Sequence, residues 1–473
     1  MALLAVGFAL SASAKIELPS ILCDNMVLQQ NAMVNLWGKA TPNAKVTITT
    51  SWAPLRRVQT TADAQGNWLV KVDTPAATFE PQTVKISDGE ALTLQNILIG
   101  DVWVCSGQSN MEMPVKGFDR QPVENSLDYI LSASQMENKI RMFKVERARS
   151  FEDLDDCKGQ WQVAAPESVA NMSATAYFFA YNLAMGVDIP IGIINTSWGG
   201  TRVESWMPQS ALEDILSKEQ IEHKKSVHSI KPTELYCGMI APIRNFSAKG
   251  FLWYQGCSNL GDNDHYDTMM ARMAEQWRKD WGDSKNEMPF YYVMIAPHIY
   301  DNSMDIAYPL FVENQVKALE KIPNSGMAAT TDIGDEFCIH PAKKFEVGRE
   351  EMNENGNMDV DVSITTRELA RMIDRAGIKF NFLPDEEFDD PMGTDTGAAV
   401  IFGATGGVME AALRTANDWL TGTSNDAVEF HEVRGTKGIK EATYTINGVE
   451  IKVAVVSGIA NANYVMNQIK AGT

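Results

Sequence analysis

Apolar and polar positions alternate along residues 15–97, and turn-forming residues interrupt the alternation at short intervals. Three stretches show it most clearly: AMVNLWG at 32–38, AKVTITT at 44–50 and GNWLVKV at 66–72. A period of two is typical of strands that bury one face, and short strands separated by Gly, Pro or Asn turns are typical of β-sandwiches. The pattern predicts a small β-sandwich domain over 15–97, in which no residue indicates catalysis.

Beyond residue 97 the pattern changes to short apolar stretches that alternate with helical periodicity. Strands are expected at 101–105, 189–194, 250–254 and 290–295, and helices at about 122–134, 174–185, 262–281 and 309–320. Strands that alternate with helices of this length predict βαβ units and a parallel sheet, with ligands bound at the carboxyl ends of the strands. We therefore expect an α/β domain over residues 98–345.

The charge and hydropathy of the chain exclude some classes of function. The 473 residues include 41 Lys and Arg against 61 Asp and Glu, a formal net charge of −20. Phosphate backbones are bound by clustered cations, so this composition argues against a nucleic-acid partner. No apolar run reaches the roughly 18 residues that a transmembrane helix needs, so we expect no membrane insertion.

The N-terminus has the pattern of a secretory signal. Residues 2–10 are apolar and the small residues at 11–14 match a signal-peptidase site, which predicts a signal peptide over 1–14 and a secreted or periplasmic protein. The alternative is a short buried strand or helix. The six cysteines show neither C-x-x-C pairs nor zinc spacing, and we expect no metal and no other cofactor.

Four short polar clusters carry candidate chemistry, each at the end of a predicted strand. In the first, Gly107 and Ser109 fit a serine on a tight turn, ahead of a helix whose N-terminal amides face developing negative charge. In the second, the pair Gly199–Gly200 lets a backbone N–H approach a substrate oxygen closely. Both patterns have a structural alternative, since serine is a common helix N-cap and glycine pairs form tight turns.

The other two clusters offer a further donor and a base. Asn259 can donate its side-chain amide to an oxyanion, and His340 can act as a general base because imidazole titrates near pH 6.5. Asp335, in the acidic turn before His340, offers a carboxylate to orient the ring. A lone histidine is more often structural. Together, however, the four clusters give a nucleophile, two oxyanion donors and a base in the loops of one sheet.

The order of these clusters resembles the sequence blocks of the SGNH hydrolases, and the residues in and around them resemble one branch of these enzymes, the sialate O-acetylesterases. The resembling segments are GDVWVCSGQSN at 100–110, NTSWGGT at 195–201, YCGMIAP at 236–242, WYQGCSN at 253–259, and TDIG at 331–334 with His340-Pro341. The resemblance covers about residues 16–348. It implies a flavodoxin-like α/β/α parallel sheet behind the N-terminal β-sandwich.

The resemblance also implies roles for the site residues. Ser109 would attack an acetyl carbonyl and His340 would take its proton. The amide of Ser109, a glycine of the 199–200 pair and Asn259 would hold the oxyanion. Family members often have an acid two residues before the histidine, where this chain has Cys338, and a glutamate where it has Cys257. Asp335 is therefore the candidate to orient His340, with a Ser–His dyad that leans on a backbone carbonyl as the alternative.

The sequence after residue 345 has a different character. The stretches PDEEFDDP at 384–391 and GAAVIFGATGGVMEAALR at 397–414 resemble the large-subunit catalytic region of iron-only hydrogenases, over about residues 341–473. The resemblance implies an α/β hydrogenase-like fragment, taken here as 346–473. The segment 342–348 suits both families, and we interpret it as the join of a chimera. The alternative is an unfamiliar C-terminal domain.

Hydrogenase chemistry is not expected from this fragment. Iron–sulfur clusters are held by cysteine thiolates, and no cysteine follows Cys338. In the hydrogenase motif the ligand cysteine falls on His340, while Lys343 matches a site lysine.

The sequence therefore predicts a metal-free serine esterase that removes O-acetyl groups by an acyl-enzyme mechanism. The expected partner is O-acetylated sialic acid or another acetylated glycan. The alternatives are an esterase of acetylated plant polysaccharide, and an inactive chimera that only binds carbohydrate.

Overall fold

A computed structural model describes residues 16–262, 264–300 and 306–350, together with single residues and short stretches after residue 412. The chain divides into two compact units, residues 1–372 and 373–473, which are described one at a time. The predicted signal peptide over 1–14 and most of the predicted fragment over 346–473 lie outside the described residues.

The first part of the chain is built of strands. They are β1 (Val27–Gln29), β2 (Met33–Lys39), β3 (Lys45–Thr50), β4 (Arg57–Thr61), β5 (Asn67–Asp73), β6 (Thr78–Ser87) and β7 (Ala91–Gly107). β2 pairs antiparallel with β5, and β3 pairs antiparallel with both β4 and β6. Val46, Ile48 and Thr50 of β3 are buried while the positions between them are less so, as a half-buried strand requires. β2, β3 and β5 coincide with the stretches predicted at 32–38, 44–50 and 66–72.

The long strand β7 connects these strands to the rest of the unit. Its first part pairs with β6, and its last residues form the middle of the main sheet, whose order is β13-β12-β11-β7-β10-β8-β9. The other strands of this order are β8 (Ile140–Lys144), β9 (Trp161–Val163), β10 (Ile191–Ser197), β11 (Gly250–Tyr254), β12 (Phe290–Val293) and β13 (Ser325–Ala328). Neighbouring strands are parallel except for β8 and β9. The unit is therefore mixed α/β with a large mixed sheet.

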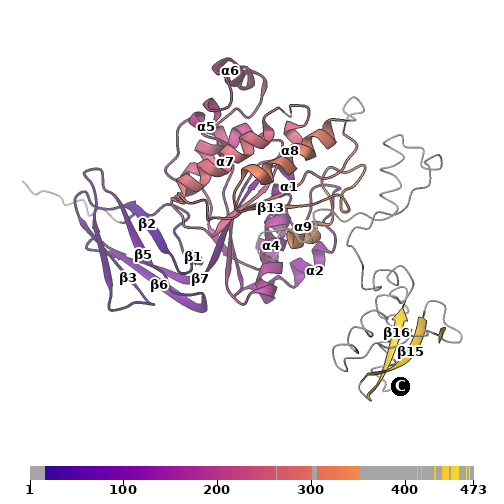
Figure 1. Ribbon diagram of the computed structural model, residues 1–473. Helices are drawn as coiled ribbons and strands as arrows, with labels where there is room; N and C mark the ends of the chain where they lie inside the picture. The colour runs from indigo at the N-terminus through magenta and orange to yellow at the C-terminus, as the bar shows by residue number, and fades with distance from the viewer. Residues whose placement is uncertain are drawn as a thin grey trace, which may run out of the picture. The chain divides into compact units, whose positions relative to one another are not determined.

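Helices cover the sheet on two sides. They are α1 (Ser109–Glu112), α2 (Ser126–Leu131), α3 (Pro166–Asn171), α4 (Ala174–Gly186), α5 (Gln209–Glu213), α6 (Lys218–Val227), α7 (Tyr266–Asp280), α8 (Ala307–Lys321) and α9 (Lys344–Glu350). Figure 1 shows α5, α7 and α8 on one face and α2, α4 and α9 on the other. The helix predicted at 122–134 is shorter than expected: it is α2, followed by a 3₁₀ turn at Ala133–Met136.

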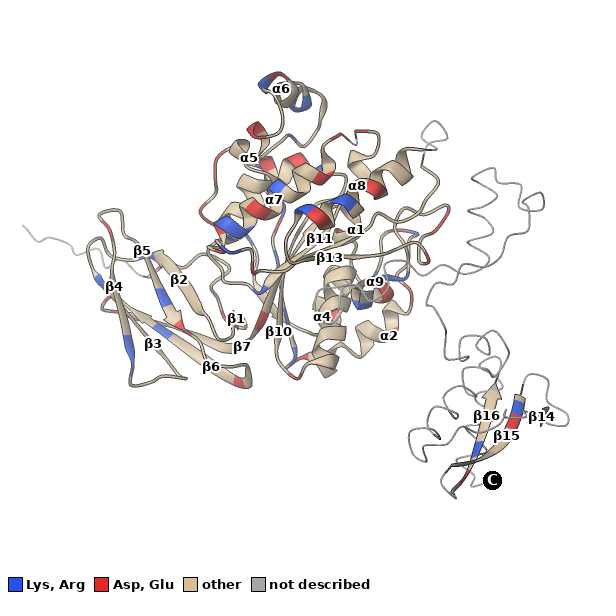
Figure 2. Ribbon diagram, viewed as in Figure 1, with Lys and Arg blue, Asp and Glu red and all other residues tan. Residues whose placement is uncertain are grey.

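The core follows the central strands. Every residue of β10 and β11 is buried, and neither strand contains a charged residue, whereas charges are frequent on α6 and α7 (Figure 2). Strands buried on both faces are expected to read as continuous apolar runs, which is the pattern that predicted them. Within the described residues, no helix combines the length and apolar character needed to span a membrane.

The second unit contains β14 (His431–Glu432), β15 (Ile439–Ile446) and β16 (Val449–Val456). They form an antiparallel sheet in which β15 lies in the middle.

Candidate active site

Three of the predicted clusters meet at one edge of the sheet because β7, β10 and β11 are adjacent and parallel. Gly107, the last residue of β7, is level with Ser197 at the end of β10 and with Tyr254 at the end of β11. Gly107 has a φ of 143°, and a Cβ added to it would lie 2.2 Å from the carbonyl oxygen of Tyr254. Only glycine fits this close approach, so the turn that follows β7 is fixed tightly against the neighbouring strand.

Ser109 is the first residue of α1 and is half-buried. No hydrogen bond joins its hydroxyl to another described residue. The side chain of Gln108, just before it, accepts hydrogen bonds from the backbone N–H of Gly256 at 3.0 Å and of Ser258 at 3.2 Å. These bonds attach the loop after β11, which carries Asn259, to the turn that carries Ser109.

The glycine pair lies on the other side of Ser109. A Cβ added to Gly199 would lie 3.3 Å from the Cβ of Ser109, so the two backbones are close. The N–H of Gly199 donates to Oε2 of Glu112 at 2.7 Å, and Arg147 pairs with the same carboxylate. Gly200 has a φ of 73° and open space beside its Cα. The two glycines therefore differ as candidate backbone donors, since the N–H of Gly199 already donates to Glu112.

His340 lies in the loop between β13 and α9. Its Nδ1 is 2.6 Å from Oε1 of Gln121, and its ring packs edge-on against Phe118 at 5.2 Å between centroids. A carbonyl oxygen only accepts, so Nδ1 carries the hydrogen and Nε2 keeps its lone pair. Nε2 is buried without a hydrogen-bond partner among the described residues. Burial, followed by the charges of Lys344 and His298, lowers the pKa of His340 to about 4, so the ring is neutral near pH 7.

Asn110 joins the serine turn to the histidine loop. Its Nδ2 donates to the carbonyl oxygen of Ile339 at 2.9 Å, and its Oδ1 accepts from Nζ of Lys344. The residue after Ser109 is thus bonded to the residue before His340, although 229 positions separate them in the chain. Asn110 thus connects the segments that carry Ser109 and His340, and no direct hydrogen bond joins these two residues in the described contacts.

No hydrogen bond joins Asp335 to the imidazole ring in the described contacts. Its Oδ1 accepts from the backbone N–H of Phe337 at 2.8 Å and of Cys338 at 3.0 Å, so the carboxylate closes its own turn. Among the described contacts, Gln121 holds Nδ1 of His340. Sequence reasoning missed Gln121, since glutamine is a common surface residue and nothing in its spacing marks it.

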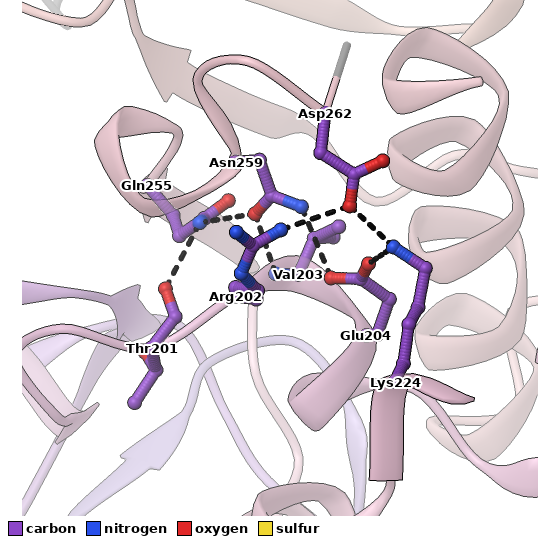
Figure 3. A network of polar contacts seen from close by, with 8 residues as sticks. All are labelled: Thr201, Arg202, Val203, Glu204, Lys224, Gln255, Asn259 and Asp262. Atoms are coloured by element: carbon purple, nitrogen blue, oxygen red, sulfur yellow. Dashed lines mark hydrogen bonds and ion pairs between the residues drawn. The ribbon is translucent and has the colours of Figure 1, made fainter. Parts of the chain in front are cut away.

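Asn259 lies within a buried polar network (Figure 3). Its Oδ1 accepts from the N–H of Val203 at 3.0 Å and from Gln255 at 2.8 Å, and its Nδ2 donates to Glu204 at 3.0 Å. These bonds fix which end of the amide is the donor. An amide nitrogen has two N–H groups, and Glu204 accepts one of them.

Charged residues extend this network to α6. Glu204 is 1% exposed and pairs with Lys224 at 2.7 Å, and Lys224 also pairs with Asp262. Burial by itself would lower the pKa of Lys224, but the neighbouring carboxylates outweigh it and raise that pKa. A buried pair of this kind is costly to break, so it holds Glu204 and through it Asn259 in place.

The described residues offer no evident metal site. No group of three or more His, Cys, Asp or Glu side chains in this part of the chain is arranged to hold an ion. All six cysteines are described, and none of them forms a disulfide.

Comparison with known proteins identifies the class of enzyme. The sequence model of a carbohydrate esterase family, described as sialic acid-specific acetylesterase, matches residues 99–348, which is more than half of the chain. The chain therefore belongs to this carbohydrate esterase family. Human sialate O-acetylesterase is 29% identical over 370 residues, which cover 71% of this chain and 70% of the human protein. The structure of a novel carbohydrate acetylesterase from Xanthomonas citri is 32% identical, with a TM-score of 0.63 over 71% of this chain and 73% of that one.

The C-terminal part matches a second family. The model described as iron only hydrogenase large subunit, C-terminal domain, matches residues 338–473. Iron hydrogenase 1 of Clostridium pasteurianum is 51% identical over 120 residues, which cover 25% of this chain and 21% of that protein. Both predicted resemblances are thus confirmed, and the two family matches overlap at residues 338–348.

Proposed function

We propose that this carbohydrate esterase is a serine esterase that hydrolyses the O-acetyl esters of sialic acids. The observation that carries the proposal is that two groups without a described hydrogen-bond partner lie on two segments that a hydrogen bond connects. The hydroxyl of Ser109 lies on the turn after β7, and the buried Nε2 of His340 has no described hydrogen-bond partner. Asn110 ties these two segments together. The family match supports an acetylated carbohydrate as the substrate.

The mechanism begins with attack of Ser109 Oγ on the acetyl carbonyl carbon. His340 Nε2 takes the hydroxyl proton, and the positive ring is held through Nδ1–H by the oxygen of Gln121. The tetrahedral intermediate collapses, the sugar hydroxyl leaves with the proton from His340, and an acetyl-serine remains. Water, deprotonated by the same nitrogen, then releases acetate and restores Ser109.

Three donors would hold the oxyanion in this mechanism: the backbone N–H of Ser109, a glycine N–H of the 199–200 pair, and Asn259 Nδ2. Gly200 is the better donor of the pair, because the N–H of Gly199 is already given to Glu112. Asp335 would assist indirectly, by fixing the turn that leads to His340. Each donor acts at the moment when negative charge develops on the carbonyl oxygen.

The proposal includes a domain organisation. Residues 1–14 would be a signal peptide of a secreted or periplasmic protein, 15–97 a β-sandwich, 98–345 the esterase domain with an SGNH-type sheet, and 346–473 a hydrogenase-like fragment joined near 342–348. The fragment would carry no hydrogenase activity, since the cluster cysteine of its motif falls on His340.

The nucleophile and base are tested by Ser109→Ala and His340→Gln, with Ser258→Ala as a matched control in the neighbouring loop. Turnover of p-nitrophenyl acetate should fall at least about 10⁴-fold in the first two variants and stay near the wild-type value in the control. Unchanged turnover in Ser109→Ala would remove the proposed nucleophile. An inactive wild type that still binds glycan would favour the carbohydrate-binding alternative.

The substrate is tested by acetate release. Wild-type enzyme is incubated with O-acetylated sialic acid and with acetylated xylan at equal acetyl concentration. Faster release from sialic acid supports the proposal, and release from xylan alone would replace it with an esterase of plant polysaccharide.

A further inference from the structure

Lys344, the first residue of α9, is fully buried beside the proposed site. Its Nζ donates to Oδ1 of Asn110 and lies 5.3 Å from the centroid of the Tyr254 ring. The neighbouring Lys343, which matches a site lysine in the hydrogenase resemblance, is exposed instead. Two adjacent lysines thus have opposite environments, and the buried one reaches the residue next to Ser109.

The surroundings of Lys344 contain no compensating carboxylate among the described ion pairs. The titratable groups that face it are the thiols of Cys257, from the loop after β11, and Cys338, with His340 from the same loop as Cys338. Burying an ammonium group without a carboxylate partner destabilises the fold, and contacts with an amide oxygen and the face of an aromatic ring offset only part of that free energy. Burial accordingly lowers the pKa of Lys344 to about 7. So costly a group indicates a role beyond packing.

Asn110 shows what that role is. A side-chain amide can rotate by 180° and exchange its oxygen and nitrogen. Protonated Lys344 can only donate and the carbonyl oxygen of Ile339 can only accept, so the two bonds together fix Oδ1 toward Lys344 and Nδ2 toward Ile339. Thr175 holds the same residue by donating to its backbone oxygen at 3.0 Å. With the donor removed, the amide loses one of the two partners that select its orientation, and the contact between the serine turn and the histidine loop weakens.

We propose that Lys344 is a positioning residue of the esterase, which acts through Asn110 to keep the Ser109 turn in register with the His340 loop. The proposal rests on the proposed function of Ser109 and His340. It also places a group of variable charge beside the base. When Lys344 is protonated, its charge opposes formation of the imidazolium that the reaction requires. Turnover should therefore rise as the pH passes through about 7 and Lys344 becomes neutral.

The test compares Lys344→Met with Lys343→Met in the full chain, using p-nitrophenyl acetate between pH 5.5 and 9. Misplacement of a reacting group by about 1 Å costs roughly 100-fold. Lys344→Met should therefore lower kcat about 10- to 100-fold at pH 8, leave KM nearly unchanged and lose the inflection near pH 7. Lys343→Met should keep the wild-type kcat and pH profile.

A second variant separates positioning from folding. Lys344→Gln keeps a neutral N–H donor, so it should recover part of the kcat lost in Lys344→Met while the inflection stays absent. Circular dichroism and thermal melting establish first that the variants are folded. If neither variant folds, Lys344 holds the fold and the proposal is overturned. If Lys344→Met matches Lys343→Met while Ser109→Ala is inactive, the positioning role fails and the proposed function stands. If Ser109→Ala is fully active, the proposed function itself has failed.

Discussion

His340 has an amide rather than a carboxylate beside it, and this makes a gain of activity predictable. Oε1 of Gln121 is 2.6 Å from Nδ1 of His340, whose pKa is lowered to about 4 mainly by burial. Gln121→Glu would place a negative charge at that oxygen with almost no change in shape. An opposite charge at this distance raises the pKa of an imidazole by about 1 to 3 units.

The magnitude of the effect follows from this shift. Each pKa unit corresponds to about 1.4 kcal/mol of added stability for the imidazolium. In the proposed mechanism the ring becomes positive as it accepts the proton of Ser109, so that energy would also lower the barrier, by up to tenfold in rate per unit. Gln121 is only half-buried and part of the gain is lost to solvation of the new carboxylate. We expect kcat for p-nitrophenyl acetate at pH 8 to rise about tenfold.

Two measurements check this reasoning. Initial rates at pH 8 give kcat, and the ring-proton resonances of the histidines, six in the chain, give the pKa directly. The His340 signal is assigned by its loss in His340→Gln. Gln121→Met, which removes the acceptor, is the matched control and should lower kcat about 10- to 100-fold. A His340 pKa that is the same in wild type and in Gln121→Glu would refute the assignment of Gln121 as the partner of the ring.

Three further predictions concern groups whose environment is fixed by the fold. Gly107→Ala places a Cβ 2.2 Å from the Tyr254 oxygen, so urea unfolding should show a loss of about 3 kcal/mol or more; an unchanged midpoint would contradict it. Asn259→Ala should lower kcat about 100-fold or more and also lower the melting temperature, since Glu204 keeps a buried oxygen without its donor; a fall in melting temperature with kcat intact would limit Asn259 to a structural role. The pKa of Lys344, lowered from 10.5 to about 7, destabilises the native state below pH 7, and this penalty disappears as the pH rises toward 10.5. In urea unfolding at pH 6, Lys344→Met should therefore be more stable than wild type, by up to about 5 kcal/mol. This difference should disappear by about pH 10. Equal stability of the two proteins at both pH values would argue against a buried cation.

The strands around the site were predictable because buried strands have a recognisable local pattern of apolar residues. The buried runs that became β10 and β11 are continuous apolar stretches, and the alternating runs at 32–38 and 44–50 became β2 and β3. The predicted strand at 189–194 ends three residues later in the structure, at Ser197, because polar Asn195, Thr196 and Ser197 continue the pairing with β7. Local apolar pattern does not mark such polar residues as part of a buried strand.

The contacts within the candidate site were also predictable only in part. Ser109 and the glycine pair stand directly after strands whose neighbours in the sheet bring them together, so topology alone predicts that they meet. Gln121 and His340 are 219 positions apart, and Asn110 and Lys344 are 234 apart. No periodicity or spacing connects residues so far apart, and each pair is made by loops whose course depends on the packing of the whole unit.

The amino-acid sequence by itself determined the family, the central strands β7, β10, β11 and β12 and the polar clusters that follow the first three, because those depend on local hydrophobic pattern and short motifs. Only the tertiary structure decided that the side-chain amide of Gln121 contacts His340 and that the buried Glu204 orients the amide of Asn259. It also decided that Lys344 is buried while the adjacent Lys343 is exposed. These are consequences of burial, which changes the cost of a charge and the number of partners within reach of a polar atom, and burial is a property of the folded chain.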